Sequence, residues 1–426
     1  MLIERGLSMK ERLQRIKRGF LFLFFALSLG GMAGGIVWLF LLLMNGGLFL
    51  LWDFIPSIVS VPWYPVVCCG IGGFLIGIWQ KRFGPYPESL MTVMNRISKE
   101  HHVNYDNLFA ILVAALLPLV FGGSIGPEAG LTGAIAGLCY WIGDHLHYAA
   151  RDVRELEKVG VSATLGVIFG AAPLLGLFSP LELSSGDTQQ RTIPKDKKLL
   201  LYCMAILGSI GVFSLLNLLI PGSGLGLPRL EVPALSGVSE FLWMLPAAAI
   251  GILCGVLYQL SGTGVHLFLR LFGNHTVWKG ICCGLLLGGC GICLPYTMFS
   301  GETQMEILSE SFLQMGWLTL LLTGVLKLVV GQLCVQSGWR GGNIFPLVFS
   351  GISVGLASSF LIPAAPMLLA AVTTASLCGY VLKKPILVIL VLLLCFPISS
   401  IVILTLGAVL GGLLPRLFRL PDPVSH

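Results

Sequence analysis

The stretch that decides the fold is Phe121-Gly122-Gly123-Ser124-Ile125-Gly126-Pro127-Glu128-Ala129-Gly130, a polar, glycine-rich break between two apolar runs. Pro127 has no N–H to lose and fixes φ for a first helical turn, so the sequence predicts a helix that begins here and continues to Trp141. The unpaired backbone N–H groups at a helix N-terminus favour a bound anion. Gly123 to Gly126 therefore form a candidate anion site, with a plain glycine-rich turn as the alternative.

The composition places this break inside a membrane protein. The 426 residues are 56% hydrophobic and 11% charged, with a mean hydropathy of +0.90, whereas soluble domains have roughly 25% charged residues. Apolar runs approaching about 20 residues recur from end to end. We expect an all-α, multi-pass protein of the lipid bilayer with one membrane domain over 19–414. A basic segment, 1–18, precedes this domain, and a short tail, 415–426, follows it without a cytoplasmic regulatory domain.

The charged residues and cysteines exclude several other classes of protein. The net charge of +6 is concentrated in short connections, beginning with the basic residues of the first 18 positions, which predicts a cytoplasmic N-terminus. These charges carry no interleaved aromatic residues, so a nucleic-acid partner is not expected. The cysteines lie mostly in apolar sequence and the histidines lack ligand spacing in an apolar pocket, so no metal or cofactor is expected.

A second break of the same design lies in the other half of the chain. It runs from Gln336 to Pro346 and joins a polar, glycine-rich turn to a proline at the start of an apolar helix. Two corresponding breaks are typical of repeat proteins whose broken helices meet at a midplane ion site. The repeats are expected over about 19–184 and 199–414. The residues expected to border the anion pathway are Gly123, Ser124, Ile125, Gly126, Gly342, Asn343, Ile344 and Phe345.

The apolar runs also predict the other helices. They are expected at Gly19–Met44, Trp63–Trp79, Ser89–Lys99 (amphipathic), Asn107–Phe121, Val159–Leu183, Leu199–Ile220, Glu240–Leu260, Val265–Phe272 (short and interfacial), Gly280–Leu294, Trp317–Gln332, Met367–Tyr380 and Pro385–Leu414.

These motifs resemble those of the CLC family of chloride channels and proton-coupled chloride antiporters, from about Val61 to Leu414. Gly123-Ser-Ile-Gly-Pro127 is similar to the family's Gly-x-Glu-Gly-Pro, and Gly342-Asn-Ile-Phe-Pro346 to its Gly-x-Phe-x-Pro. Supporting pieces are Phe169-Gly-Ala-Ala-Pro-Leu-Leu-Gly176 and Gly84-Pro-Tyr-Pro87, which stands where the family has Gly-Ser-Gly-Ile-Pro. The resemblance implies an inverted repeat of broken and tilted helices and a homodimer in which each subunit has its own pore.

The departures from the family pattern concern its proton-carrying and anion-binding side chains. Ile125 stands where the resemblance places the external gating glutamate, and Leu183 where antiporters carry an internal glutamate. The pore serine is missing from the break at Gly84, and no tyrosine follows Tyr380 to act as the inner pore tyrosine. The sequence therefore favours a passive channel for chloride or a similar monovalent anion. The alternative is a proton-coupled antiporter with a displaced carboxylate, Glu128 or Glu182.

Two charged residues have competing interpretations. Glu128 either replaces the missing gate or complements the dipole of its own helix, and the second is favoured because helix geometry turns it away from Ile125. Lys327 lies inside an apolar helix, where an ammonium group is costly, and is expected either to attract anions or to snorkel or pair with Glu182 or Glu302. No Ser/His pair, His-Glu-x-x-His motif or facing carboxylate pair points to an enzyme. A scaffold that transports nothing is the remaining alternative.

Overall fold

The regular structure of this protein is helical. The computed structural model describes residues 9–87, 108–131, 195–220, 229–233 and 237–418, and within these ranges there are helices but no strand. This confirms the all-α prediction. The chain divides into two compact units, one formed by 1–39, 94–106 and 134–224, the other by 40–93, 107–133 and 225–426.

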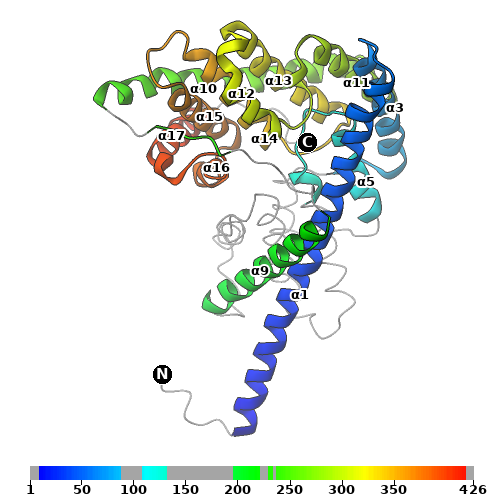
Figure 1. Cartoon of the computed structure of the whole chain (residues 1–426), viewed down its shortest axis with the longest axis vertical. Helices are drawn as coiled ribbons and strands as arrows, with labels where there is room; N and C mark the ends of the chain where they lie inside the picture. Colours follow the sequence, from blue (N-terminus) through cyan, green and yellow to red (C-terminus); the bar gives the residue numbers. More distant parts are fainter. Residues whose placement is uncertain (1–8, 88–107, 132–194, 221–228, 234–236, 419–426) are drawn as a thin grey trace. The chain divides into compact units, whose positions relative to one another are not determined.

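The helices of the described residues are numbered in chain order, and Figure 1 labels most of them. They are α1 (Met9–Leu48), η2 (Phe49–Phe54), α2 (Ile55–Ile58), α3 (Tyr64–Phe83), α5 (Leu108–Val120), α9 (Lys195–Leu219), α10 (Val238–Arg270), α11 (Thr276–Cys293), η4 (Pro295–Thr297), α12 (Glu302–Met315), α13 (Trp317–Ser337), α14 (Ile344–Ser358), α15 (Pro366–Leu382), α16 (Pro385–Leu392), η5 (Ile398–Ser400) and α17 (Ile401–Phe418).

Most of the predicted helices within the described residues are confirmed to within about five residues, although α1 begins at Met9 instead of Gly19, and two other predictions were wrong. The expected interfacial helix Val265–Phe272 is the last part of the continuous α10, because no proline interrupts the chain after Leu260. The expected run Pro385–Leu414 is two helices, because Pro397 follows α16 with extended backbone and cannot continue a helix. The predictions for Ser89–Lys99 and Val159–Leu183, Glu182 included, fall outside the described residues.

Several of these helices are suited to a bilayer. Five helical stretches in the described part of the chain are long and apolar enough to cross it: Leu23–Ile58, Tyr64–Phe83, Glu240–Arg270, Thr276–Cys293 and Trp317–Ser337. Large apolar side chains on them are exposed, among them Leu253 and Leu260 on α10, as expected where a helix faces lipid. The protein is an integral, multi-pass membrane protein.

In the unit formed by 1–39, 94–106 and 134–224, α1 packs against α9 through glycine. A Cβ atom on Gly30 would overlap the backbone of Ala205, and one on Gly34 would overlap Ser209. Without a hydrophobic driving force between helices in lipid, small residues of this kind allow the backbones to approach and gain van der Waals contact.

The larger unit is built around α14 and α15. Every residue of α14 is buried, and so is α15 from Leu368 to Tyr380. The two helices touch at glycine, since a Cβ on Gly351 would lie 2.6 Å from the Cα of Thr374. The N-terminus of α14, which belongs to the second predicted break, is therefore held by a close-packed interior.

At the edge of this unit α3 and α11 run side by side (Figure 1). Cβ atoms on Gly73 and Gly284 would overlap backbone atoms of Gly280 and Cys69 on the facing helix. Gly289, on the same α11, has nothing within 4 Å of the position of its Cβ. The two helices are thus in backbone contact along one face only.

This contact predicts opposite effects of the same substitution at two positions of α11. Gly284→Ala should destabilise the protein by about 1–3 kcal/mol through overpacking. Gly289→Ala should be neutral or stabilising by up to about 1 kcal/mol, because alanine favours the helix. Thermal unfolding of the two detergent-solubilised variants measures the difference, and equal melting temperatures would contradict the packing described here.

Candidate functional site

The first break is a helix end closed by glycine. After α5, Gly122 adopts a φ of +83°, which glycine tolerates without strain. Its N–H donates to the carbonyl of Leu119 (3.2 Å), and the N–H of Gly123 donates to that of Pro118 (2.7 Å), the hydrogen-bond pattern of a Schellman motif. The chain then reaches the short helical segment 128–131, where the described part of the predicted helix lies.

The second break also begins with a left-handed glycine. Gly338 caps α13 with a φ of +104°. The next residue, Trp339, is completely buried and donates from Nε1 to the carbonyl of Gly280 on α11 (3.1 Å). The indole thus fixes the turn against the α3–α11 pair.

The proline-rich segment at Gly84-Pro-Tyr-Pro87 is joined to this second break. The side-chain amide of Gln80 donates to the carbonyls of Tyr86 (2.7 Å) and Gly338 (2.9 Å). Arg340 donates from Nη1 to the carbonyl of Pro85 (2.8 Å). The structure therefore places this segment beside the second break, although it carries no serine.

The two predicted breaks meet at a pair of glycines. The N–H of Gly126 donates to the carbonyl of Gly342 (2.7 Å), and the N–H of Gly342 donates back to that of Gly126 (2.8 Å). Beside this bridge, a Cβ on Gly341 would collide with the side chain of Ile125, which is completely buried. Segments more than 200 residues apart in sequence thus form one short antiparallel contact.

Glu128 reaches across this bridge. Its Oε1 accepts a hydrogen bond of 3.0 Å from the backbone N–H of Ile344, the first residue of α14. The side chain is completely buried, and a Cβ on either Gly126 or Gly342 would overlap its carboxyl group. A carboxylate therefore lies at the N-terminus of α14, where the helix dipole and the unpaired N–H groups favour negative charge.

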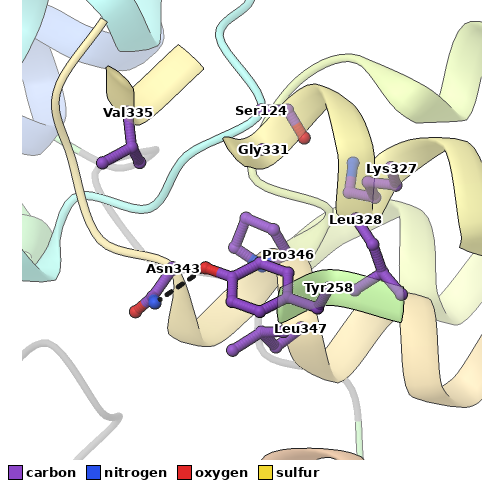
Figure 2. A pocket seen from close by; sticks show the side chains of 9 residues that line it. All are labelled: Ser124, Tyr258, Lys327, Leu328, Gly331, Val335, Asn343, Pro346 and Leu347. Atoms are coloured by element: carbon purple, nitrogen blue, oxygen red, sulfur yellow. Dashed lines mark hydrogen bonds between the residues drawn. The ribbon is translucent and has the colours of Figure 1, made fainter. Parts of the chain in front are cut away.

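A small cavity lies next to the two breaks. Its volume is about 10 Å³, which is room for about one water molecule. Figure 2 shows how residues of both breaks and of the helices α10, α13 and α14 surround it. The lining residues are Ser124, Tyr258, Lys327, Leu328, Gly331, Val335, Asn343, Pro346 and Leu347.

Two hydroxyl groups on this cavity have hydrogen to donate. Ser124 is buried and its Oγ has no hydrogen-bond partner. The hydroxyl of Tyr258 accepts a bond of 3.2 Å from the side-chain amide of Asn343 (Figure 2), so its own hydrogen is left for a second partner. Tyr258 was missed in the sequence because it lies in α10, far before the segment where the resemblance places a pore tyrosine. The sequence feature that could have indicated it is a single tyrosine within an apolar span.

Lys327 borders the cavity, but its ammonium group already donates hydrogen bonds to three backbone carbonyls. Its ammonium donates to the carbonyls of Tyr296 (2.9 Å), Met298 (2.9 Å) and Phe299 (3.0 Å). It also lies 4.6 Å from the ring centroid of Phe349, within cation–π range. This completely buried lysine fixes the turn between α11 and α12, and only its long-range charge acts on the cavity.

That turn is linked to the first break and ends at a second buried acid. The N–H of Phe299 donates to the carbonyl of Gly122 (3.0 Å). Glu302, the first residue of α12, is 5% exposed and its Oε1 has no hydrogen-bond partner. The site therefore contains two buried carboxyl groups and one buried ammonium group.

The predicted site residues fall into three groups. Gly126, Gly342, Ile344 and Glu128 form the bridge, with Ile125 packed beside it; Ser124 and Asn343 line the cavity with Lys327. The N–H of Gly123 is used in the cap of α5, and Phe345 is buried but does not line the cavity. Since the N–H groups of Gly126, Gly342 and Ile344 already have protein acceptors, an anion would have to replace one of them. Anion binding at these residues stays a prediction.

Comparison with known proteins agrees with this arrangement. The model of the family described as "Voltage gated chloride channel" matches residues 72–416. The "Putative ion-transport protein YfeO" of Escherichia coli strain UMN026 is 24% identical over 331 residues, which is 74% of each chain. The protein of the same name from Escherichia fergusonii has the same identity and coverage.

Solved structures share the fold. A CLC-type fluoride/proton antiporter superposes with a TM-score of 0.71 over 97% of this chain and 98% of its own, at 19% identity. A slow cyanobacterial Cl⁻/H⁺ antiporter gives a TM-score of 0.74 over 94% of this chain and 96% of its own, also at 19% identity. The chain belongs to the voltage-gated chloride channel family, the CLC family, and is an anion-transport protein rather than an enzyme.

Proposed function

We propose that this protein exchanges chloride, or a similar monovalent anion, for protons, with Glu128 as the gate. The observation that carries the proposal is the hydrogen bond from the Ile344 N–H to the buried Glu128 carboxylate. The sequence favoured a passive channel because Ile125 stands where a carboxylate was expected. Glu128 supplies a carboxylate from three residues further along, at a helix N-terminus contributed by the other half of the chain.

The chemistry of the gate follows from competition for one set of donors. An ionised Glu128 satisfies the Ile344 N–H and the positive end of the α14 dipole, so it excludes an anion from that place. A protonated Glu128 is neutral and holds this position less strongly. The side chain can then leave, an anion can take the N–H group, and the proton moves with the side chain.

The cavity beside the bridge offers a second position for the anion. Ser124 and Tyr258 can donate hydrogen bonds there, and the nearby charge of Lys327 favours a negative occupant. Neutral donors hold an ion weakly enough for release, as conduction requires. The homodimer and the cytoplasmic N-terminus belong to the same proposal, the first from the resemblance and the second from the basic N-terminal residues.

The proposal predicts that proton movement depends on the Glu128 carboxyl. In proteoliposomes an outward chloride gradient should drive protons inward, against their own gradient. Glu128→Gln has the same shape but cannot release a proton, so it should keep anion flux and stop proton movement. Glu231→Gln, which changes an exposed carboxyl, should behave like wild type. Anion flux without proton movement in the wild type would instead identify a passive channel.

The cavity predicts a separate effect on anion affinity. Tyr258→Phe and Ser124→Ala each remove a neutral donor to a charged ligand, worth about 1.5–3 kcal/mol. Each variant should therefore raise the anion concentration for half-maximal flux about tenfold or more. The control is Tyr380→Phe, whose hydroxyl bonds Gln259 and does not line the cavity. If both cavity variants keep the wild-type affinity, the anion does not bind in this cavity.

A further inference from the structure

Gly331 lies in the middle of the α13 face that borders the cavity (Figure 2). The lining residues Lys327, Gly331 and Val335 follow one another at intervals of four along this helix. Residues four apart lie on the same side of a helix, one turn above another. The cavity therefore meets bare backbone at the one turn that separates the lysine from the valine.

Helix packing does not require a glycine at this position. Among the described residues, a Cβ atom on Gly331 would have one atom of another segment within 4 Å, the carbonyl oxygen of Ser124 at 3.6 Å, which is an ordinary van der Waals contact. A Cβ on Gly324, about two turns earlier on α13, would instead lie 2.7 Å from Cγ2 of Val354. Gly324 is thus needed for the contact with α14, whereas the space beside Gly331 is open.

The missing side chain of Gly331 matters for the size of the cavity. A glycine inside a helix is less favourable than an alanine, so a glycine without a packing role calls for another reason. The cavity has about 10 Å³, room for about one water molecule, and a methyl group takes up at least that much space. An alanine at this position would therefore occupy the place of whatever the cavity holds.

The groups around this space suit an occupant of one atom. The hydroxyl groups of Ser124 and Tyr258 can donate to a single negative centre, and Lys327 adds its positive charge. The rest of the wall is largely apolar and offers a larger, polyatomic anion neither donors nor room. Its apolar members are Leu328, Val335, Pro346 and Leu347.

We propose that Gly331 is a specificity-determining residue, which leaves room for one monatomic anion beside Ser124 and Tyr258 and excludes larger anions. The inference rests on the part of the proposed function that places an anion in the cavity. It does not depend on the exchange of that anion for protons.

The test is calorimetric titration of the detergent-solubilised protein with fluoride, chloride, bromide and nitrate at alkaline pH, where an ionised Glu128 keeps the anion away from Ile344. Gly331→Ala should lower the affinity for chloride and bromide about tenfold or more, as one methyl group does in a closed pocket, and the affinity for fluoride less. Val335→Ala removes two methyl groups from the same face and should shift the preference toward bromide and nitrate.

Two controls separate anion size from protein stability. Gly289→Ala changes a glycine on α11 that also has open space around it but does not line the cavity, so it should keep the wild-type affinities. Gly331→Ala should melt at or above the wild-type temperature, because alanine favours the helix and meets no clash. A loss of anion affinity in a protein of undiminished stability then reports on the cavity itself.

The outcomes distinguish this inference from the proposed function. If Gly331→Ala binds all four anions as the wild type does while Tyr258→Phe binds chloride more weakly, the anion occupies the cavity and Gly331 does not set its size. An equal loss for all four anions also overturns the inference, because size selection must favour the smallest. If Gly331→Ala changes selectivity in a protein that moves no protons, the inference stands and the proton exchange falls.

Discussion

The hydrogen bond between the Ile344 N–H and the Glu128 carboxylate lies where two broken helices begin in the buried interior of the protein. Backbone N–H groups in such a place have no water to bind, and each one left unpaired costs several kcal/mol. The reciprocal Gly126–Gly342 bonds satisfy two of these buried N–H groups, and Glu128 satisfies a third. Both glycines are required because any side chain at these positions would overlap the Glu128 carboxyl.

The same constraint connects structure with transport. Donors that must be satisfied by the protein at rest can also be satisfied by an anion, provided that the carboxylate leaves. The surrounding structure is suited to a small movement of this kind, since α14 is buried along its whole length. The first break is fixed by the capping bonds of Gly122 and Gly123, and the second by the side-chain bonds of Gln80 and Trp339. Lys327 adds to this rigidity by binding three carbonyls of the turn that supports Gly122. A side-chain exchange therefore needs no rearrangement of the helices.

Much of this arrangement could be predicted from the sequence, and the reasons for the failures are physical. Apolar run length and proline position located most helices, and the two glycine-rich breaks were recognised because polar backbone is rare at membrane depth. The sequence predicted that Glu128 points away from Ile125, because only the geometry of its own helix could be considered. The residue whose N–H bonds Glu128 lies 216 positions later in the chain. The burial of Lys327 among carbonyls could not be inferred from its place in an apolar helix. Tyr258 was missed because its cavity exists only once α10 packs near both breaks.

The most direct test of the account is a structure determined with bromide at acidic and at alkaline pH, because bromide can be located by its anomalous scattering. The account predicts that at acidic pH the Glu128 side chain has left α14 and a bromide ion accepts a hydrogen bond from the Ile344 N–H. At alkaline pH the carboxylate should occupy that position and exclude the ion. A Glu128 side chain that stays on Ile344 at both pH values, with bromide bound elsewhere, would contradict it.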